Sequence, residues 1–387
     1  MDNTEKAIGK IRKILGEKMK INKTIWLTLT ILLAAPLSGC LGPGGNEGSD
    51  NSEPAYKVTV LTYDVFALSD SMLSDFTNRT GIEVEIIKVD DSGTVLARAL
   101  QTKDNPIADV IVGIDNSFLQ VALDNELFTN LYNAKIPELH VEATTPYSGN
   151  FVVPYDWGRV CINYDTTFVD GENVTAPTSL WDFTNDTWEG KVVVQNPRTS
   201  SPGRSFMLAT VDYFANDADD STDFTDWWSA MKANDVIVTD GWTEAYETHY
   251  SGGYGQWYDG FVGNANAVVS YCHSPGVEAF YGDNWTTSVA LTLDRASFLQ
   301  VEYAGIAKGA AHPIDALVFI DEMLATGVQS TISTTNFMYP ADVNYTLPSE
   351  NGYLYHTGVP NQDSSLTAEE IGAGIDEWLN QWDSAMA

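Results

Sequence analysis

Positive charge is scarce in this chain of 387 residues, which has 20 Lys and Arg against 53 Asp and Glu and a formal net charge of −33. Nucleic acid is therefore a poor partner, because each phosphate contact needs a cation that this surface mostly lacks. Cysteine is also rare, and three Cys residues are too few for a disulfide-rich scaffold. Hydrophobic residues, at 44%, are plentiful enough to exclude wholesale disorder, and the length allows two domains.

Catalytic and metal-binding motifs are absent from the sequence. The five His residues are scattered, with no His pair at helical spacing, no paired-cysteine metal motif, no nucleophile elbow and no P-loop. Cys272 and His273 are neighbours, but adjacent side chains of an extended segment point to opposite faces and do not form a nucleophile and base. We expect no enzyme, no metal and no cofactor, with an exported hydrolase as the alternative of a different class.

The first 39 residues differ from the rest of the chain. They carry seven cations and three acids, followed by an apolar run over 25–37 and the sequence Leu37-Ser38-Gly39-Cys40. This order predicts a signal peptide (1–39) ending in a lipobox, with Cys40 as the lipid-modified first residue and a flexible tether over 40–55. Removing the leader changes the net charge from −33 to −37. An uncleaved signal anchor and a start at Met19 remain alternatives.

Hydrophobic periodicity in the body predicts alternating strands and helices, typical of an α/β fold whose ligand lies at the carboxyl ends of the strands. We expect strands at 56–63, 82–89, 108–112, 160–164, 191–194, 236–239, 267–271 and 299–307. Helices are expected at 71–80, 94–102, 205–214, 224–233, 312–325 and 368–382.

Aromatic residues at loop positions are the main sign of a ligand site. Tyr63, Trp242, Tyr271 and Phe337 are placed to line one pocket, an arrangement that suits a flat cation, although each one alone is more typical of a core. The segment 198–203 adds hydroxyl groups and backbone donors suited to an anion. Cys161 and Cys272 lie in predicted strands, and a disulfide and two buried thiols fit equally well.

Ordered segments from residue 56 to the end resemble thiamine-binding lipoproteins and periplasmic proteins, a branch of the type II solute-binding proteins of ABC importers. The matching segments are Leu61-Thr-Tyr-Asp-Val-Phe66, 108–116, Val153-Pro-Tyr-Asp-Trp-Gly158, 196–203, Gly241-Trp-Thr-Glu-Ala-Tyr246, 269–271 with Ser274-Pro275, and 336–340. The resemblance implies two α/β lobes that are joined by two crossover strands and close on a ligand in the cleft. It places lobe 1 at 56–157 plus about 299–333, and lobe 2 at about 158–298 plus 334–387.

The resemblance also implies the ligand contacts. Carried over position by position, these are Tyr63, Asp91, Ser92, Thr199, Ser200, Trp242, Tyr246, Tyr271 and Phe337. The chain departs from the family at Leu68-Ser69-Asp70, where the family often has an aromatic residue, at Val277, where it has a tyrosine, and at Phe337, where it has a tryptophan. An insertion over 251–266 adds Tyr254, Trp257 and Tyr258 near the expected site.

The function that this resemblance implies is capture of thiamine or a thiamine phosphate outside the cell and delivery to an ABC transporter permease. The protein would be a monomer, held at the cell surface by lipid. The alternative within the same fold is a receptor for a polyamine or ferric ion. Iron is disfavoured because ferric sites of this type use adjacent tyrosines, and Tyr271 is followed by Cys272.

Overall fold

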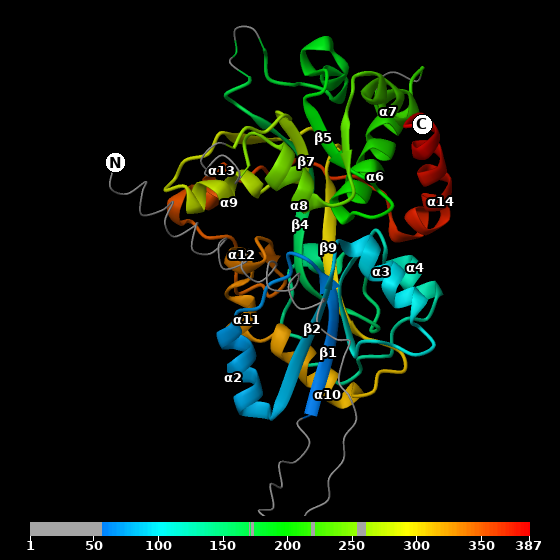
Figure 1. Ribbon diagram of the computed structural model, residues 1–387, viewed down its shortest axis with the longest axis vertical. Helices are drawn as coiled ribbons and strands as arrows, with labels where there is room; N and C mark the ends of the chain where they lie inside the picture. Colours follow the sequence, from blue (N-terminus) through cyan, green and yellow to red (C-terminus); the bar gives the residue numbers. More distant parts are fainter. Residues whose placement is uncertain (1–55, 170, 172–173, 218–220, 254–260) are drawn as a thin grey trace, which may run out of the picture.

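The computed structural model describes residues 56–169, 171, 174–217, 221–253 and 261–387 (Figure 1). The predicted signal peptide, the lipid site at Cys40 and the tether lie outside these residues. So do Tyr254, Trp257 and Tyr258 of the insertion. In the described part of the chain, no helix combines the length and apolar character needed to cross a bilayer.

All strands belong to one mixed sheet with the order β2-β1-β3-β9-β4-β7-β5-β6, and β8 and β10 also pair with β4. Their bounds are β1 Tyr56–Tyr63, β2 Ile82–Val89, β3 Val110–Asp115, β4 Val153–Asp165, β5 Val192–Gln195, β6 Ile237–Thr239, β7 Ala267–Tyr271, β8 Ser288–Leu291, β9 Phe298–Ile306 and β10 Tyr339–Pro340. The long strands β4 and β9 pair antiparallel in the middle of the sheet, where they connect its two halves (Figure 1).

Helices cover the sheet in both halves of the molecule. They are α2 Asp70–Thr80, α3 Ser92–Gln101, α4 Leu119–Asp124, α5 Val141–Thr144, α6 Ser201–Ala215, α7 Phe224–Ala233, α8 Trp242–Glu244, α9 Ser274–Tyr281, α10 Pro313–Met323, α11 Thr326–Gln329, α12 Ile332–Thr335, α13 Tyr353–His356 and α14 Ala368–Ala385. A π-helical turn, η3 (Ala245–His249), follows α8, and short 3-10 segments lie at η1 Leu180–Thr184, η2 Asp186–Trp188 and η5 Glu350–Gly352.

The predicted elements are confirmed, with two informative shifts in their bounds. The strand expected at 160–164 is the end of the 13-residue β4, whose residues are buried almost throughout and so lack the alternation that marks a half-buried strand. The helix expected at 205–214 begins at Ser201, because the Ser200 side chain caps it and Pro202 fits the first helical turn.

The buried apolar side chains form one cluster on each side of the connecting strands. The first draws on β1, β3, α10 and the segment 152–157, and we call this half lobe 1. The second draws on β5, α6, α7 and α14, and a smaller one packs around Tyr246 and Tyr250; this half is lobe 2. The resemblance predicts that the chain passes from one lobe to the other near residues 157, 299 and 333. These crossing points stay a prediction.

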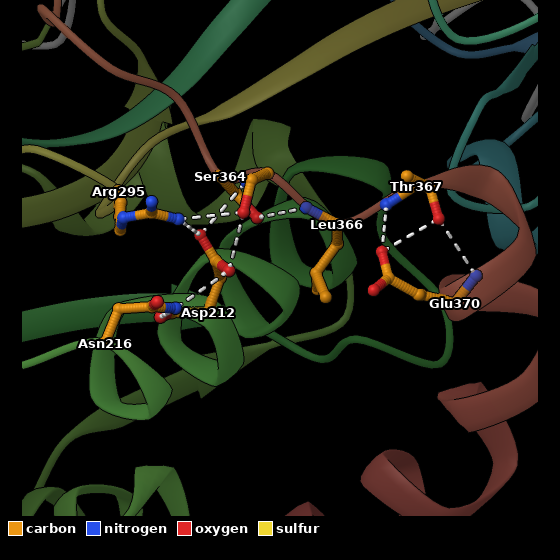
Figure 2. A network of polar contacts seen from close by, with 8 residues as sticks. Asp212, Asn216, Arg295, Ser364, Leu366, Thr367 and Glu370 are labelled. Atoms are coloured by element: carbon orange, nitrogen blue, oxygen red, sulfur yellow. Dashed lines mark hydrogen bonds and ion pairs between the residues drawn. The ribbon is translucent and has the colours of Figure 1, made fainter.

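The C-terminal segment is fixed to lobe 2 by a polar network around Asp212 of α6 (Figure 2). The Asp212 carboxylate accepts hydrogen bonds from Arg295 Nη1 at 3.0 Å and from the backbone N–H of Ser365 at 3.0 Å. Thr367 and Glu370 then cap α14 reciprocally. The chain end thereby packs against α7 and closes the core of lobe 2.

Candidate functional site

The carboxyl end of β1 and the start of α3 meet at one edge of lobe 1. β1 and β2 pair in parallel and end together at Tyr63 and Val89, so that Asp91 follows directly as the N-cap of α3. The Tyr63 ring lies against Gly113, where an added Cβ would come within 2.3 Å of it and where φ is +94°. Glycine is required there, because any side chain would displace this tyrosine.

Asp91 connects the two lobes. Its carboxylate accepts hydrogen bonds from the backbone N–H of Ser92 (2.7 Å), of Ser201 at the start of α6 (3.2 Å) and of Trp242 at the start of α8 (3.3 Å). Burial raises the pKa of Asp91 to about 6, and these hydrogen bonds act in the opposite direction by stabilising the ionised form. The carboxylate of lobe 1 therefore lies where backbone donors from lobe 2 converge.

Trp242 and Tyr246 form a stacked aromatic pair. Their ring centroids are 4.7 Å apart at an interplanar angle of 16°. The indole Nε1 of Trp242 donates to the Ser270 hydroxyl at 2.8 Å, and the fully buried Tyr246 hydroxyl donates to Glu278. Trp242 is half-buried, so Tyr246 supports it from within the core and the indole is held at the surface of lobe 2.

Tyr271 and Phe337 are connected through a buried histidine. The Tyr271 ring stacks on His273 with centroids 5.3 Å apart, and the Tyr271 hydroxyl accepts a hydrogen bond from Gln300 Nε2 at 3.0 Å. Burial lowers the pKa of His273 to about 4, so the ring is neutral and its Nε2–H donates to the Phe337 carbonyl at 2.6 Å. Phe337 has a φ of 61°, a strained conformation for an aromatic residue.

The hydroxyl groups predicted to contact the ligand already have protein partners. Ser92 Oγ donates to the Gly113 carbonyl at 2.5 Å, and Thr199 Oγ1 donates to the Asp240 carbonyl at 2.7 Å. Ser200 caps α6. The Thr199 carbonyl accepts the backbone N–H of Gly93 at 3.0 Å, a second direct contact between the lobes. These residues therefore lie together with Asp91 at the junction of α3 and α6.

A group of buried polar residues next to Tyr63 was not among the predicted contacts. Glu302 Oε2 accepts hydrogen bonds from the hydroxyls of Tyr63 at 2.7 Å and Tyr155 at 2.6 Å, and Asp156 is the cross-strand partner of Glu302. Sequence offers a signal for them, because Asp156 and Glu302 are carboxylates in two long and largely buried strands.

The chemistry of a thiol nucleophile is ruled out at Cys272. Cys161 of β4 and Cys272, the residue that follows β7, form a disulfide, which settles the pairing that sequence left open. No group of His, Cys, Asp and Glu arranged to hold a metal ion occurs among the described residues. The arrangement presents aromatic rings, carboxylates and backbone donors, which are groups that can bind a small ligand.

Comparison with known proteins concerns the family and the fold of the chain. The family model for bacterial extracellular solute-binding proteins matches residues 105–355. The thiamine-binding periplasmic protein of Salmonella typhimurium is 27% identical over 337 residues, 85% of this chain and 93% of the relative, and that of Escherichia coli is 27% identical over 336 residues, with the same coverage. A solved periplasmic thiamin-binding protein superposes with a TM-score of 0.70 at 25% identity, covering 90% of this chain and all of the other. The predicted two-lobed type II fold is thus confirmed.

Proposed function

Because this chain belongs to the family of bacterial extracellular solute-binding proteins, we propose that it captures thiamine or a thiamine phosphate outside the cell and delivers it to an ABC transporter permease. Relatives that carry the name thiamine-binding periplasmic protein align along 85% of the chain, which supports thiamine as the first ligand to test. The proposal includes anchoring by lipid on Cys40 and action as a monomer.

The stacked pair of Trp242 and Tyr246 beside the Asp91 carboxylate is the observation that carries the proposal. Thiamine has a permanently cationic thiazolium and a flat aminopyrimidine with an exocyclic amine. A supported indole offers a face for stacking and cation–π attraction, and a buried carboxylate accepts from an amine or balances the cation. The two groups are neighbours, because the backbone N–H of Trp242 donates to the Asp91 carboxylate at 3.3 Å.

The other end of thiamine carries a hydroxyethyl group or its phosphate. The start of α6 offers the backbone N–H groups of Ser201 and Gly203, the first bonded to Asp91 and the second to the Ser200 hydroxyl. Donors at a helix N-terminus favour an anion or a hydroxyl oxygen. This supports binding of both thiamine and thiamine monophosphate. Which of the two binds more tightly depends on whether the ligand displaces the Asp91 carboxylate from these N–H groups.

A fluorescence titration tests the proposal. Thiamine, thiamine monophosphate and spermidine are added separately to the mature chain, and intrinsic tryptophan emission is followed. We expect quenching by thiamine with micromolar or tighter Kd, and its loss in Trp242→Ala. Trp285→Ala is the matched control, because Trp285 is 51% exposed and lies outside the site. Quenching by spermidine alone would replace thiamine with a polyamine as the ligand.

Lipid anchoring is tested on the full-length chain. Expression of the wild type and of Cys40→Ala in a host that processes lipoproteins should give a membrane-bound and a released protein, respectively. Mass spectrometry of the N-terminus should find a lipid on Cys40 of the wild type. An unmodified Cys40 in a chain that retains residues 1–39 would instead establish the uncleaved signal anchor.

A further inference from the structure

Two carboxylates face each other at the centre of the sheet, where lobe 1 meets lobe 2. Asp156 of β4 and Glu302 of β9 are cross-strand partners, 0% and 3% exposed. The pairing of β4 with β9 shifts register between Pro154 and Asp156, which leaves Tyr155 as the extra residue of a bulge. A bulge of this kind turns consecutive side chains toward the same partner, so both Tyr155 and Asp156 lie near Glu302.

The two carboxylates differ in how they are satisfied. Glu302 accepts from the Tyr63 and Tyr155 hydroxyls through Oε2 and from Gln300 Nε2 at 3.2 Å through Oε1. Neither carboxylate oxygen of Asp156 meets hydrogen-bond geometry with a described residue, although the Asn336 and Tyr155 side chains lie near enough to act on its pKa. A buried carboxylate without a partner is costly to maintain, and a purely structural role would be served better by an amide or apolar side chain.

Within the part of the chain that the structure describes, no cation balances these acids. Neither Asp156 nor Glu302 takes part in any ion pair of the described residues. The surrounding titratable groups are neutral or acidic: Tyr63 of β1, Tyr155 of β4, Tyr271 of β7, Asp91 at the start of α3 and Asp115 of β3. Arg204 acts on Asp115 and lies over the Phe118 ring, with Cζ 3.6 Å from its centroid.

Burial, followed by mutual repulsion in the case of Asp156, raises the pKa of both carboxyl groups above their ordinary values. Two carboxylates that share one buried site do not both ionise near neutral pH, so the empty protein keeps a proton on the pair. A cation bound beside the pair would supply the missing positive charge and stabilise both ionised carboxylates. Their pKa values would fall, and the proton would be released.

We propose that Asp156 and Glu302 form the charge-recognition subsite for a cationic organic ligand, and that ligand binding exchanges the proton held by this pair for the ligand's positive charge. The O–H bond of the protonated carboxyl group is the only bond that breaks, its electron pair stays on the carboxylate, and the released proton binds to the buffer. The inference deepens the proposed function by assigning the thiazolium end of thiamine to these acids. It also stands for any other organic cation that enters from the side of Tyr63 and Tyr271.

Linkage fixes the direction of the pH effect. Because the empty protein binds more protons than the loaded protein, affinity for the cation rises with pH. The gain is up to about tenfold per pH unit where one proton is released. A neutral thiazole alcohol, which lacks the positive charge, should bind more weakly and release no proton.

The test is calorimetric titration of thiamine at pH 6 in several buffers that differ in ionisation enthalpy. The dependence of the observed heat on that enthalpy gives the number of protons released, and we expect about one per thiamine. Glu302→Gln and Asp156→Asn should abolish the release and weaken binding at least about tenfold. Asp165→Asn is the matched control, because Asp165 is a buried acid of the same strand that protein donors already hold.

Asp91→Asn separates the pair from the other raised carboxyl of the site, and the release should persist in this variant. Tight thiamine binding with no proton release, or release abolished only by Asp91→Asn, would overturn the inference and leave the proposed function intact. Proton release with spermidine but no binding of thiamine would support the subsite and contradict thiamine as the ligand. If neither pair variant folds, the wild-type buffer series with thiamine and the neutral thiazole decides.

Discussion

Trp242 lies flat on Tyr246, with ring centroids 4.7 Å apart and planes 16° from parallel. Hydrogen bonds hold both rings, that of Trp242 to Ser270 and that of Tyr246 to Glu278. A stack fixed in this way presents its outer face to a ligand without first losing side-chain entropy, which is one way in which preorganisation raises affinity.

Gly93 sets how closely the lobes approach. Its backbone N–H donates to the Thr199 carbonyl, and a Cβ at this position would come within 2.5 Å of that oxygen. Gly93→Ala should therefore hold the lobes apart and weaken thiamine binding about tenfold or more without unfolding either lobe. Calorimetry gives the affinity, and small-angle scattering should show that thiamine no longer reduces the radius of gyration.

Gly327→Ala is the matched control, because nothing lies within 4 Å of a Cβ built there and its φ is not in the left-handed region. This variant should bind and close like the wild type. If Gly93→Ala and the wild type bind thiamine with equal affinity, the ligand-bound protein does not have the close contact between α3 and α6.

Glu278 gives the unfolding equilibrium a pH dependence. Burial raises the pKa of Glu278 from 4.5 to about 7. A raised folded-state pKa stabilises the protein fully below pH 4.5, and this contribution is lost as pH rises through about 7. In urea unfolding, the free-energy advantage of the wild type over Glu278→Gln should therefore be larger at pH 4.5 than at pH 7.5.

The exposed strand residue Glu83 supplies the control for this measurement. Glu83→Gln should differ from the wild type by the same small amount at both pH values. If Glu278→Gln also differs from the wild type by the same amount at both pH values, burial does not raise the pKa of Glu278 to about 7.

The disulfide between Cys161 and Cys272 spans a sequence separation of 111 residues and joins the connecting strand β4 to the residue that follows β7. The double variant Cys161→Ala, Cys272→Ala should lower the free energy of unfolding by about 2–4 kcal/mol, chiefly because the unfolded chain regains freedom. Denaturant unfolding of the wild type with and without reductant should give a similar difference. An unchanged midpoint in both experiments would show that the bond does not form in solution.

Sequence predicted the elements of this fold well, because periodicity and caps are local. The strand over 82–89 and the helix over 224–233 have the predicted bounds. The first seven residues of β4 escaped prediction since Pro154 and Asp156 interrupt an apolar pattern whose burial comes only from neighbours distant in sequence. The conformational preference of a short segment does not depend on neighbours that are distant in sequence, so it does not predict their effect.

The candidate site was predicted in part and for the same reason. Aromatic residues at loop positions drew attention to Tyr63, Trp242 and Tyr271, whereas the contact of Asp91 with the start of α8 joins residues 151 positions apart. The pair of Asp156 and Glu302 arises from the register of two strands, which no single segment encodes. The fold is thus readable from segments, whereas the arrangement of charge is readable only from their packing.

Calorimetric titration with thiamine tests the central claim most directly, namely that a cation is captured against the Trp242 stack between the two lobes. The wild type and Trp285→Ala should bind one thiamine with micromolar or tighter Kd, and Trp242→Ala should lose at least about tenfold in affinity, the loss expected from about 1.4 kcal/mol of stacking and cation–π attraction. Absence of heat with thiamine in the wild type, or a Trp242→Ala variant that binds as tightly as Trp285→Ala, would contradict it.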